Sequence, residues 1–402
     1  MMRWDIFCRV IDNYGDIGVC WRLARQLVAE HGIAVRLWVD NVTSLQRICP
    51  DVDAFQEVQN CRGVEVRRWT EPLPELAPAD VVIEAFGCEL PENYVAAMVP
   101  TVSHSTGQAQ SRLSLTRRKV KRVWINLEYL SAEQWVEGCH GLPSPHPYLP
   151  MIKHFFFPGF TPMTGGLLRE KGLLMQRDVL QHNLAELWCQ LDLPLPISSE
   201  ITISLFCYDS APISNLLDAW AASTTAIRCL LPEGKALGQA ANWAGRTGLA
   251  VGDSVQRGNL LLQIIPFLPQ EHYDLLLWAC DCNFVRGEDS FVRAQWAARP
   301  LIWQIYPQQE NVHQIKLDAF LYRYCQGLAE EAVAALCSFH HNWNSGGCLD
   351  WDDFWQHHAE LQSHAAAWAG QLAQLIDLAS NLVSFCKNKL SCKNLNFKRD
   401  KK

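Results

Sequence analysis

Hydrophobic and polar positions alternate with two different periods along the first 40 residues. Residues 4–11 (WDIFCRVI) are apolar apart from Asp5 and Arg9, which predicts a strand. Residues 19–31 carry apolar side chains at spacings of three and four and are followed by Gly32, which predicts a helix and its end. Residues 33–39 (IAVRLWV) predict a second strand. We therefore expect a β-loop-α-β unit, from which parallel sheets with right-handed crossovers are built.

The same order of elements continues along the chain. Residues 79–87 and 122–130 predict further strands, whereas 141–166 show neither period, are rich in Pro, Gly and aromatic residues, and predict a long loop near a domain junction. Residues 167–191 predict a helix that leads into a second series. This series alternates strands at 202–208, 226–232, 260–267, 282–287 and 300–306 with helices at 212–222, 233–244, 270–280, 288–298 and 308–324.

The pattern as a whole predicts an α/β protein with two doubly wound domains. A length of 402 residues agrees, because single cores rarely grow beyond about 250 to 300 residues. We place an N-terminal Rossmann-like domain at 1–185, a C-terminal one at 186–378, and a basic, disordered tail without amphipathic period at 379–402. Two Rossmann-like domains that face each other across a cleft form the architecture called GT-B. A fold alone indicates no function, so the site residues must decide.

Composition narrows the class of protein. The formal net charge of −7 argues against nucleic acid as the main partner, because phosphate binding needs clustered Lys and Arg. No stretch of about 18 apolar residues and no signal-peptide pattern occurs, so we expect a cytoplasmic protein that does not enter a membrane. The 16 cysteines are scattered, which predicts reduced, mostly buried thiols rather than a disulfide framework.

The loop DNYGDIG, residues 12–18, stands where dinucleotide-binding folds carry three glycines and no acid. A loop after the first strand of an open parallel sheet faces the ligand crevice, so Asp12 and Asp16 could both project into it. Gly15 and Gly18 would allow backbone to approach a ligand closely. Alternatively, Asp16 caps the following helix and Asp12 makes an Asx turn. Two carboxylates would repel a phosphate, so the loop suits a cationic or hydroxylated substrate better.

A second candidate site lies in CNFVRGEDSFVRAQWAARP, residues 282–300. A predicted strand ends at Arg286 and Gly287, and a helix begins near Glu288, Asp289 and Ser290. The free N–H groups of that first turn form an anion site at the crevice. Ser290 can add a hydroxyl, and Glu288 can accept hydrogen bonds from sugar hydroxyls. The alternative is a charged helix start with no ligand, because acids are favourable at that end.

A third group of residues lies near strand ends in the second domain. Aromatic faces can stack on a base, and a Gln side chain has both donor and acceptor for a pyrimidine edge; core packing is the alternative. The residues are Phe206, Tyr208, Phe267, Gln270 and Tyr273. No HExxH, CxxC or P-loop motif occurs, so we expect neither a metal site nor an NTPase site.

Four long stretches of the chain resemble one family. They are NYGDIGVCWRLARQL, KHFFFPGFTPMTGGLLRE, PFLPQEHYDLLLWACDCNFVRGEDSF and WQIYPQQENVH. Together they resemble the bacterial protein-arginine rhamnosyltransferases that modify elongation factor P, the EarP family, from about residue 1 to 378. The resemblance implies a metal-independent, inverting GT-B enzyme without a cofactor, which moves L-rhamnose from dTDP-β-L-rhamnose to one arginine of elongation factor P.

The resemblance also implies roles for residues at the matching positions. Asp12, Asp16 and Glu288 match the acids on which activity depends, and Asp289 and Ser290 match pyrophosphate contacts. The thymine pocket falls on Phe206, Phe267 and Tyr273, with Tyr208 and Gln270 beside it. Gly15, Arg286 and Gly287 complete the donor site that we expect.

An arginine acceptor explains why one loop needs two acids. Arginine has a pKa of about 12.5 to 13.8, so neutralising it at pH 7 before attack would cost roughly 7 to 9 kcal/mol. A carboxylate can instead take the proton while the C–N bond forms, and a second carboxylate can hold the guanidinium. We assign Asp16 as the base and Asp12 as the orienting partner.

Two alternative functions, one within the same class of enzymes and one outside it, also fit parts of the sequence. One is a GT-B transferase with another nucleotide sugar and a glycan or small-molecule acceptor, as in heptosyltransferases; a preference for UDP, GDP or ADP over dTDP would indicate it. The other is a catalytically silent nucleotide-sugar sensor, against which the acids at 12, 16 and 288 argue.

Overall fold

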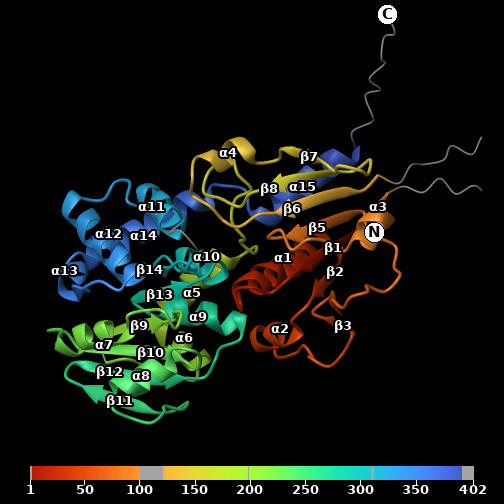
Figure 1. The fold of residues 1–402 in the computed structure, drawn as a ribbon. Helices are drawn as coiled ribbons and strands as arrows, with labels where there is room; N and C mark the ends of the chain where they lie inside the picture. The colour runs from red at the N-terminus through yellow and green to blue at the C-terminus, as the bar shows by residue number, and fades with distance from the viewer. Residues whose placement is uncertain (1, 100–120, 198, 309–311, 392–402) are drawn as a thin grey trace, which may run out of the picture.

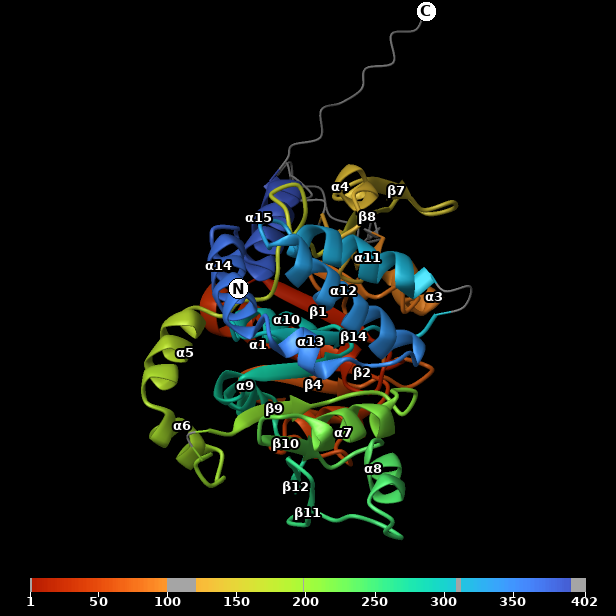
Figure 2. The ribbon, with the colours of Figure 1, turned by 90° about the vertical axis from the view of Figure 1, so that its left-hand side faces the viewer.

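The computed structural model describes residues 2–99, 121–197, 199–308 and 312–391. Its two lobes each contain one mostly parallel sheet covered by helices on both faces (Figures 1 and 2). The two-domain GT-B prediction is confirmed. No helix in this part of the chain combines the length and apolar character that crossing a bilayer requires.

The first sheet has the strand order β3-β4-β2-β1-β5-β6-β8-β7, in which β3 and β7 run antiparallel to their neighbours. The six parallel strands follow the Rossmann order, so the loop after β1 lies at the switch point beside β5. The strands are β1 (Arg3–Cys8), β2 (Ala34–Val39), β3 (Val58–Cys61), β4 (Val64–Arg68), β5 (Val81–Ala85), β6 (Val123–Leu127), β7 (Pro143–Pro145) and β8 (Ile152–Phe156). The helices are α1 (Gly15–His31), α2 (Val42–Ile48), α3 (Glu92–Met98) and α4 (Trp135–Cys139).

The second sheet has the order β11-β12-β10-β9-β13-β14, with β11 antiparallel. Its switch point lies between β9 and β13, so the loop after β13 faces the crevice. The strands are β9 (Ile201–Leu205), β10 (Ile227–Pro232), β11 (Ser254–Arg257), β12 (Leu260–Ile265), β13 (Cys282–Arg286) and β14 (Leu301–Gln304). The helices are α5 (Leu173–His182), α6 (Leu184–Gln190), α7 (Ile213–Ala222), α8 (Leu237–Trp243), α9 (Gln270–Ala279), α10 (Asp289–Trp296), α11 (Val312–Tyr324), α12 (Glu330–Ser345), α13 (Trp351–Trp355) and α14 (His358–Ala373).

Two predictions between the domains are wrong. Residues 141–166 are not a plain loop, because β8 pairs in parallel with β6 and β7 pairs with β8; the sheet partner outweighs the Pro-rich local sequence. Residues 167–191 form two helices rather than one, and Asn183 separates them by accepting a hydrogen bond from the Glu186 N–H. Leu173 and Leu180 of α5 belong to the same hydrophobic cluster as the buried residues of the second sheet.

The prediction of a disordered tail at 379–402 is also wrong over its first half. Residues 378–391 form the helix α15 (Leu378–Ser391), which packs on α1 and β6 of the first domain. Its apolar residues recur at helical spacing, and Leu382, Val383 and Cys386 are buried there. Burial of that face stabilises the helix despite its basic end. The rest of the tail lies outside the described residues.

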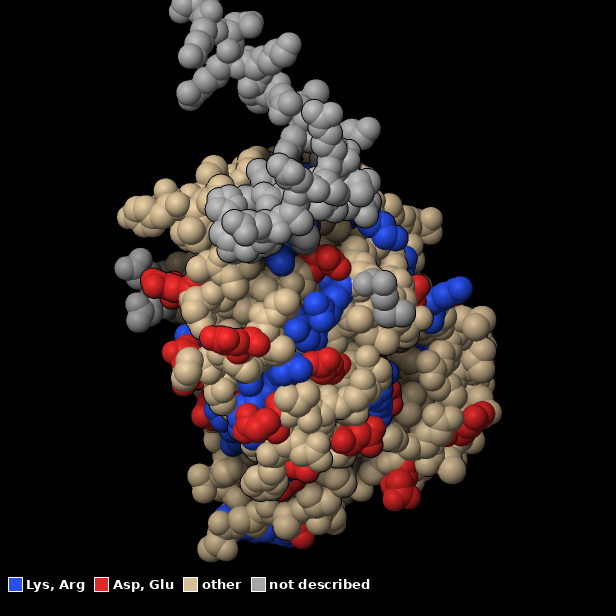
Figure 3. All heavy atoms as spheres, turned by 90° about the vertical axis from the view of Figure 1, so that its right-hand side faces the viewer, with Lys and Arg blue, Asp and Glu red and all other residues tan. Residues whose placement is uncertain are grey.

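The structure shows how charged side chains are distributed on one face of the molecule and where the cysteines lie. On the face shown in Figure 3, basic side chains form a stripe with acidic side chains on both sides of it rather than a broad basic surface. No disulfide joins described residues, and most of their cysteines are buried free thiols, as predicted.

Candidate active site

The two loops that the sequence singled out face each other across the domain boundary. One connects β1 to α1, and the other connects β13 to α10. The first turns of α1 and α10 lie so close that a Cβ added to Gly18 would stand 3.0 Å from the Cβ of Asp289. Glycine at this position therefore allows the two helix N-termini to approach each other.

Asp16 lies in the first turn of α1 and is almost fully buried. Its Oδ2 accepts hydrogen bonds from the N–H groups of Ile11 and Asp12, at 2.8 and 2.9 Å. It therefore fixes the preceding loop instead of capping its own helix, so that alternative is wrong. Burial raises the pKa of Asp16, while those two N–H groups and the Tyr129 hydroxyl counteract part of the rise. A carboxylate with a raised pKa is the better base.

Asp12 reaches across the boundary to the second domain. Its Oδ1 accepts a hydrogen bond from Nη1 of Arg286 at 3.1 Å, and its Oδ2 accepts one from the Tyr208 hydroxyl at 2.7 Å. A Cβ on Gly15 or on Gly287 would lie 2.6 Å from that Oδ2. Both glycines thus leave room for the Asp12 carboxylate, which is committed to this contact rather than to an Asx turn.

The acids line a cavity of about 220 Å³ between the domains, which we call the acid cavity. Glu288 lies on its wall and accepts a hydrogen bond from the Leu130 N–H at 2.9 Å. Burial, and then the charge of Asp16, raise the pKa of Glu288 to about 8, although the Leu130 N–H opposes the rise. The other polar or aromatic residues of the wall are Asp12, Asp16, Tyr129, Phe291, Trp303, Tyr306, Gln308 and Lys316.

A second, narrower cavity of about 50 Å³ adjoins it, which we call the aromatic cavity. Gly15 lines both cavities, so they meet at the β1–α1 loop. Ring pairs form the walls, with centroids 5.6 Å apart for Phe206 and Tyr273 and 4.8 Å apart for Phe267 and Tyr14. The remaining predicted donor residues on this cavity are Gln270, Arg286, Asp289 and Ser290.

Some buried polar atoms of the aromatic cavity have no hydrogen-bond partner among the described residues. They include Oε1 of Gln270 and Nε of Arg286. The amide of Gln270 donates instead to the carbonyl of Gly18 and to Asp289, both at 3.0 Å. A buried acceptor and a buried donor that lack partners fit a ligand with polar edges.

The side chains of Asp289 and Ser290 have hydrogen-bond partners within the protein. Oδ1 of Asp289 accepts a hydrogen bond from Nε of Arg22 at 2.8 Å, and Oγ of Ser290 bonds to the backbone of Arg286. The charge of Asp289 is therefore balanced by Arg22. Since the first N–H groups of a helix have no partner within it, the first turn of α10 presents backbone donors to an anion.

An ion-pair network joins the domains beside this turn. Arg22 of α1 binds both oxygens of Asp274 at 2.9 and 3.0 Å, and Arg293 binds the same carboxylate at 2.7 and 3.0 Å. Burial alone would raise the pKa of Glu170, but Arg293 and Arg22 lower it to about 2. The crevice is thus held by charged contacts that span both domains.

The structure brings together all the predicted site residues, in two adjoining groups. Sequence reasoning missed Tyr14, Tyr129 and Lys316, and it missed the network of Arg22 and Asp274. Tyr14 lies inside DNYGDIG, where the sequence predicted roles for the acids and glycines but not for the tyrosine. For Tyr129, Lys316 and the network no local signal exists, because only the fold brings them to the crevice.

Comparisons with known proteins agree with this geometry. A family model described as Elongation-Factor P (EF-P) rhamnosyltransferase EarP matches residues 4–387. The protein-arginine rhamnosyltransferase of Pseudomonas putida is 48% identical over 396 residues, which cover 96% of this chain and 99% of the relative. That of Pseudomonas aeruginosa is 46% identical over 390 residues, with the same coverage of 96% and 99%.

A solved structure points the same way. It is described as the structural basis for EarP-mediated arginine glycosylation of translation elongation factor EF-P, and it matches with a TM-score of 0.66 and 36% identity over 96% of this chain and 99% of that one. The chain therefore belongs to the EarP family of elongation factor P rhamnosyltransferases and is a glycosyltransferase of the GT-B fold.

Proposed function

We propose that this chain transfers L-rhamnose from dTDP-β-L-rhamnose to an arginine side chain of elongation factor P, with inversion at the anomeric carbon. The observation that carries the proposal is the meeting of two unlike cavities at Gly15. The aromatic cavity suits a nucleoside, and the acid cavity suits a sugar and a guanidinium. A donor that spans both would place its anomeric carbon beside the acids.

The nucleotide half of the donor fits the aromatic cavity. Phe206 and Phe267 offer ring faces for a base, and the unpartnered Oε1 of Gln270 can accept from the N–H of a thymine edge. The first turn of α10 and the Arg286 guanidinium can stabilise the diphosphate as negative charge develops on it. These groups belong to the protein, so no step of this account requires a metal ion.

Asp12 already binds a guanidinium, namely that of Arg286. We expect Arg286 to turn toward the donor diphosphate when the donor binds, which frees Asp12 for the guanidinium of the acceptor. The Arg286 side chain has cation–π contacts, with its guanidinium 4.5 Å from the rings of Phe206 and Tyr208, so it can pivot within the aromatic cavity.

The proposed transfer forms one bond, breaks one bond and moves one proton. A guanidinium nitrogen of the acceptor forms a bond to the anomeric carbon, the bond from that carbon to the diphosphate oxygen breaks, and dTDP leaves on the opposite face. Asp16 takes the proton that the nitrogen loses as the new bond forms. Asp12 orients the guanidinium, and Glu288, whose pKa is about 8, faces the same cavity and contacts the sugar.

Donor identity and stereochemistry test the proposal. Binding of dTDP, UDP, GDP and ADP is compared by calorimetry, and the modified acceptor peptide is examined by NMR. We expect dTDP to bind most tightly and the rhamnosyl-arginine to carry the α configuration. Tighter binding of another nucleotide, or retention of the β configuration, would overturn the donor assignment or the inverting mechanism, respectively.

A further inference from the structure

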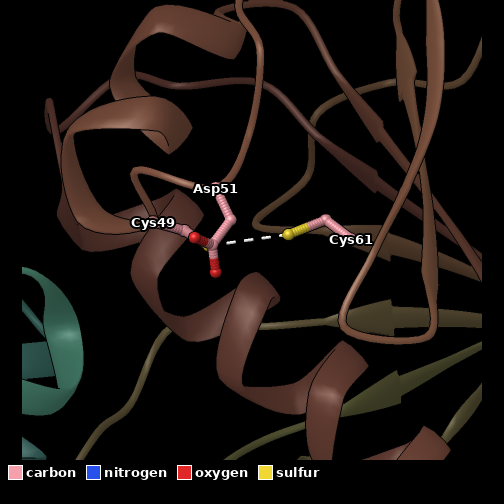
Figure 4. A group of neighbouring side chains, drawn as sticks. All are labelled: Cys49, Asp51 and Cys61. Atoms are coloured by element: carbon pink, nitrogen blue, oxygen red, sulfur yellow. Dashed lines mark hydrogen bonds between the residues drawn. The ribbon is translucent and has the colours of Figure 1, made fainter.

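Three possible metal ligands gather in the first domain, outside both cavities. Cys49 follows the last residue of α2, Asp51 lies two residues further on, and Cys61 ends β3 (Figure 4). One ligand atom from each lies within 4.8 Å of the others, and the two Sγ atoms are 3.7 Å apart. Both cysteines are buried, whereas Asp51 is exposed. The group is therefore closed on the sulfur side and open to solvent on the carboxylate side.

The sulfur spacing fits one particular geometry. Two thiolates bound to a tetrahedral Zn²⁺, each at about 2.3 Å, lie about 3.8 Å apart. The observed 3.7 Å matches this value. A carboxylate oxygen is a usual third ligand of Zn²⁺, and a water molecule can take the fourth position from the exposed side. Soft thiolates also favour Zn²⁺ over Mg²⁺ or Ca²⁺.

Arg62 holds the carboxylate of Asp51 through its guanidinium group. Its Nε and Nη2 donate to Oδ2 of Asp51 at 3.0 and 2.9 Å, which leaves Oδ1 for a metal. Metal-binding carboxylates are commonly held by such outer contacts. Two thiolates and one carboxylate exceed the charge of Zn²⁺ by one unit, and the guanidinium balances the remainder. Arg62 also contacts Glu271 of α9 at 2.5 Å, so the group lies next to a contact between the domains.

We propose that Cys49, Asp51 and Cys61 bind one Zn²⁺, which ties the end of α2 to the hairpin formed by β3 and β4. The absence of a metal motif in the sequence does not exclude this site, because its ligands come together only through the hairpin. A matched control exists in the same chain: Cys325 and Cys337 have their Sγ atoms 3.9 Å apart, but no third ligand joins them among the described residues.

Zinc stoichiometry and spectroscopy test the site in the full chain. The reduced protein is stripped with a chelator, incubated with ZnCl₂ or CoCl₂, freed of excess metal and analysed by mass spectrometry and absorption. The variants are the double change C49S/C61S, D51N and the control C325S/C337S. Thermal unfolding confirms that each variant is folded, and D51N covers the case in which C49S/C61S does not fold.

We expect wild type and C325S/C337S to retain one equivalent of zinc more than C49S/C61S, and their cobalt forms to show thiolate charge-transfer bands. D51N is expected to bind zinc at least about tenfold more weakly, because one ligand is lost. Equal zinc content in wild type and C49S/C61S, loss of zinc in the control, or unchanged affinity in D51N would each overturn the site.

Discussion

At the scale of single residues, two of the three acids of the acid cavity, Asp16 and Glu288, have different environments. Asp16 accepts two backbone hydrogen bonds, whereas Glu288 accepts one. Burial raises the pKa of both, and the charge of Asp16 raises that of Glu288 further, to about 8. At neutral pH a Glu288 with a pKa of about 8 is mostly protonated, so it can donate a hydrogen bond into the cavity that Asp16 also lines.

Because the pKa of Glu288 is raised, we predict that the stability of the protein depends on pH. The folded protein binds this proton more tightly than the unfolded chain, so stability due to Glu288 is full at low pH and is lost as the pH rises from about 4.5 to about 8. Glu288→Gln keeps the oxygen that accepts from Leu130 but does not titrate. We expect the variant to gain melting temperature relative to wild type across that pH range. Thermal unfolding at closely spaced pH values measures it; a constant difference would contradict the assigned pKa.

The sequence could predict these residues because they carry chemistry in a short motif. DNYGDIG and RGEDSF contain the acids, the glycines and the helix start within a few positions of one another. It could not predict their partners. Asp12 contacts Arg286 and Tyr208, which lie 274 and 196 residues away along the chain, and only the approach of the two domains brings them together.

At the scale of elements, the site depends on the close approach of α1 and α10. A side chain at position 18 would collide with Asp289. Arg22 and Gln270 hold Asp289 by hydrogen bonds, so it cannot move aside easily. Strand and helix positions near the sheet centres were predictable from periodicity. The hairpin strands β7 and β8 were not, because their pairing partners rather than their own sequences determine them.

A methyl group at position 18 tests this approach. Gly18→Ala is expected to lower the free energy of unfolding by about 1 to 3 kcal/mol through overpacking, and to reduce transfer activity because the two helix starts move apart. The matched control is Gly238→Ala in α8, where an added Cβ meets nothing within 4 Å. There we expect unchanged activity and equal or slightly greater stability. Denaturant unfolding compares the two; equal effects would show that the contact with Asp289 is unimportant.

At the scale of the whole molecule, buried charges connect the two domains. Arg22 pairs with Asp274 and Asp289, and α15 packs on the first domain although it follows the second along the chain. The chain thus crosses between the domains twice, once from the first domain into the second and once before α15, which packs on the first domain. Composition and periodicity predicted two domains but could not predict this return, because the apolar face of α15 is short and next to a basic end.

Two arginines of α1, Arg22 and Arg25, allow a buried ion pair to be compared with a partly exposed one. Arg22→Met removes a buried guanidinium from three carboxylates, those of Asp274, Asp289 and Glu170, and is expected to cost about 3 to 5 kcal/mol of stability. Arg25→Met removes the partly exposed pair with Glu271 and is expected to cost about 0 to 1 kcal/mol. Denaturant unfolding of both variants gives the comparison. A loss for Arg22→Met no larger than that for Arg25→Met would mean that the network does not hold the domains together.

In the proposed reaction, this chain attaches rhamnose to an arginine of elongation factor P, and Asp16 is the base. Intact mass spectrometry of elongation factor P, incubated with dTDP-β-L-rhamnose and enzyme, tests it most directly. Wild type should add the mass of one deoxyhexose, and Asp16→Asn, with dTDP affinity unchanged, should do so at least about a hundredfold more slowly. No added mass with wild type would contradict the function, and near-normal turnover by Asp16→Asn would contradict the role of Asp16.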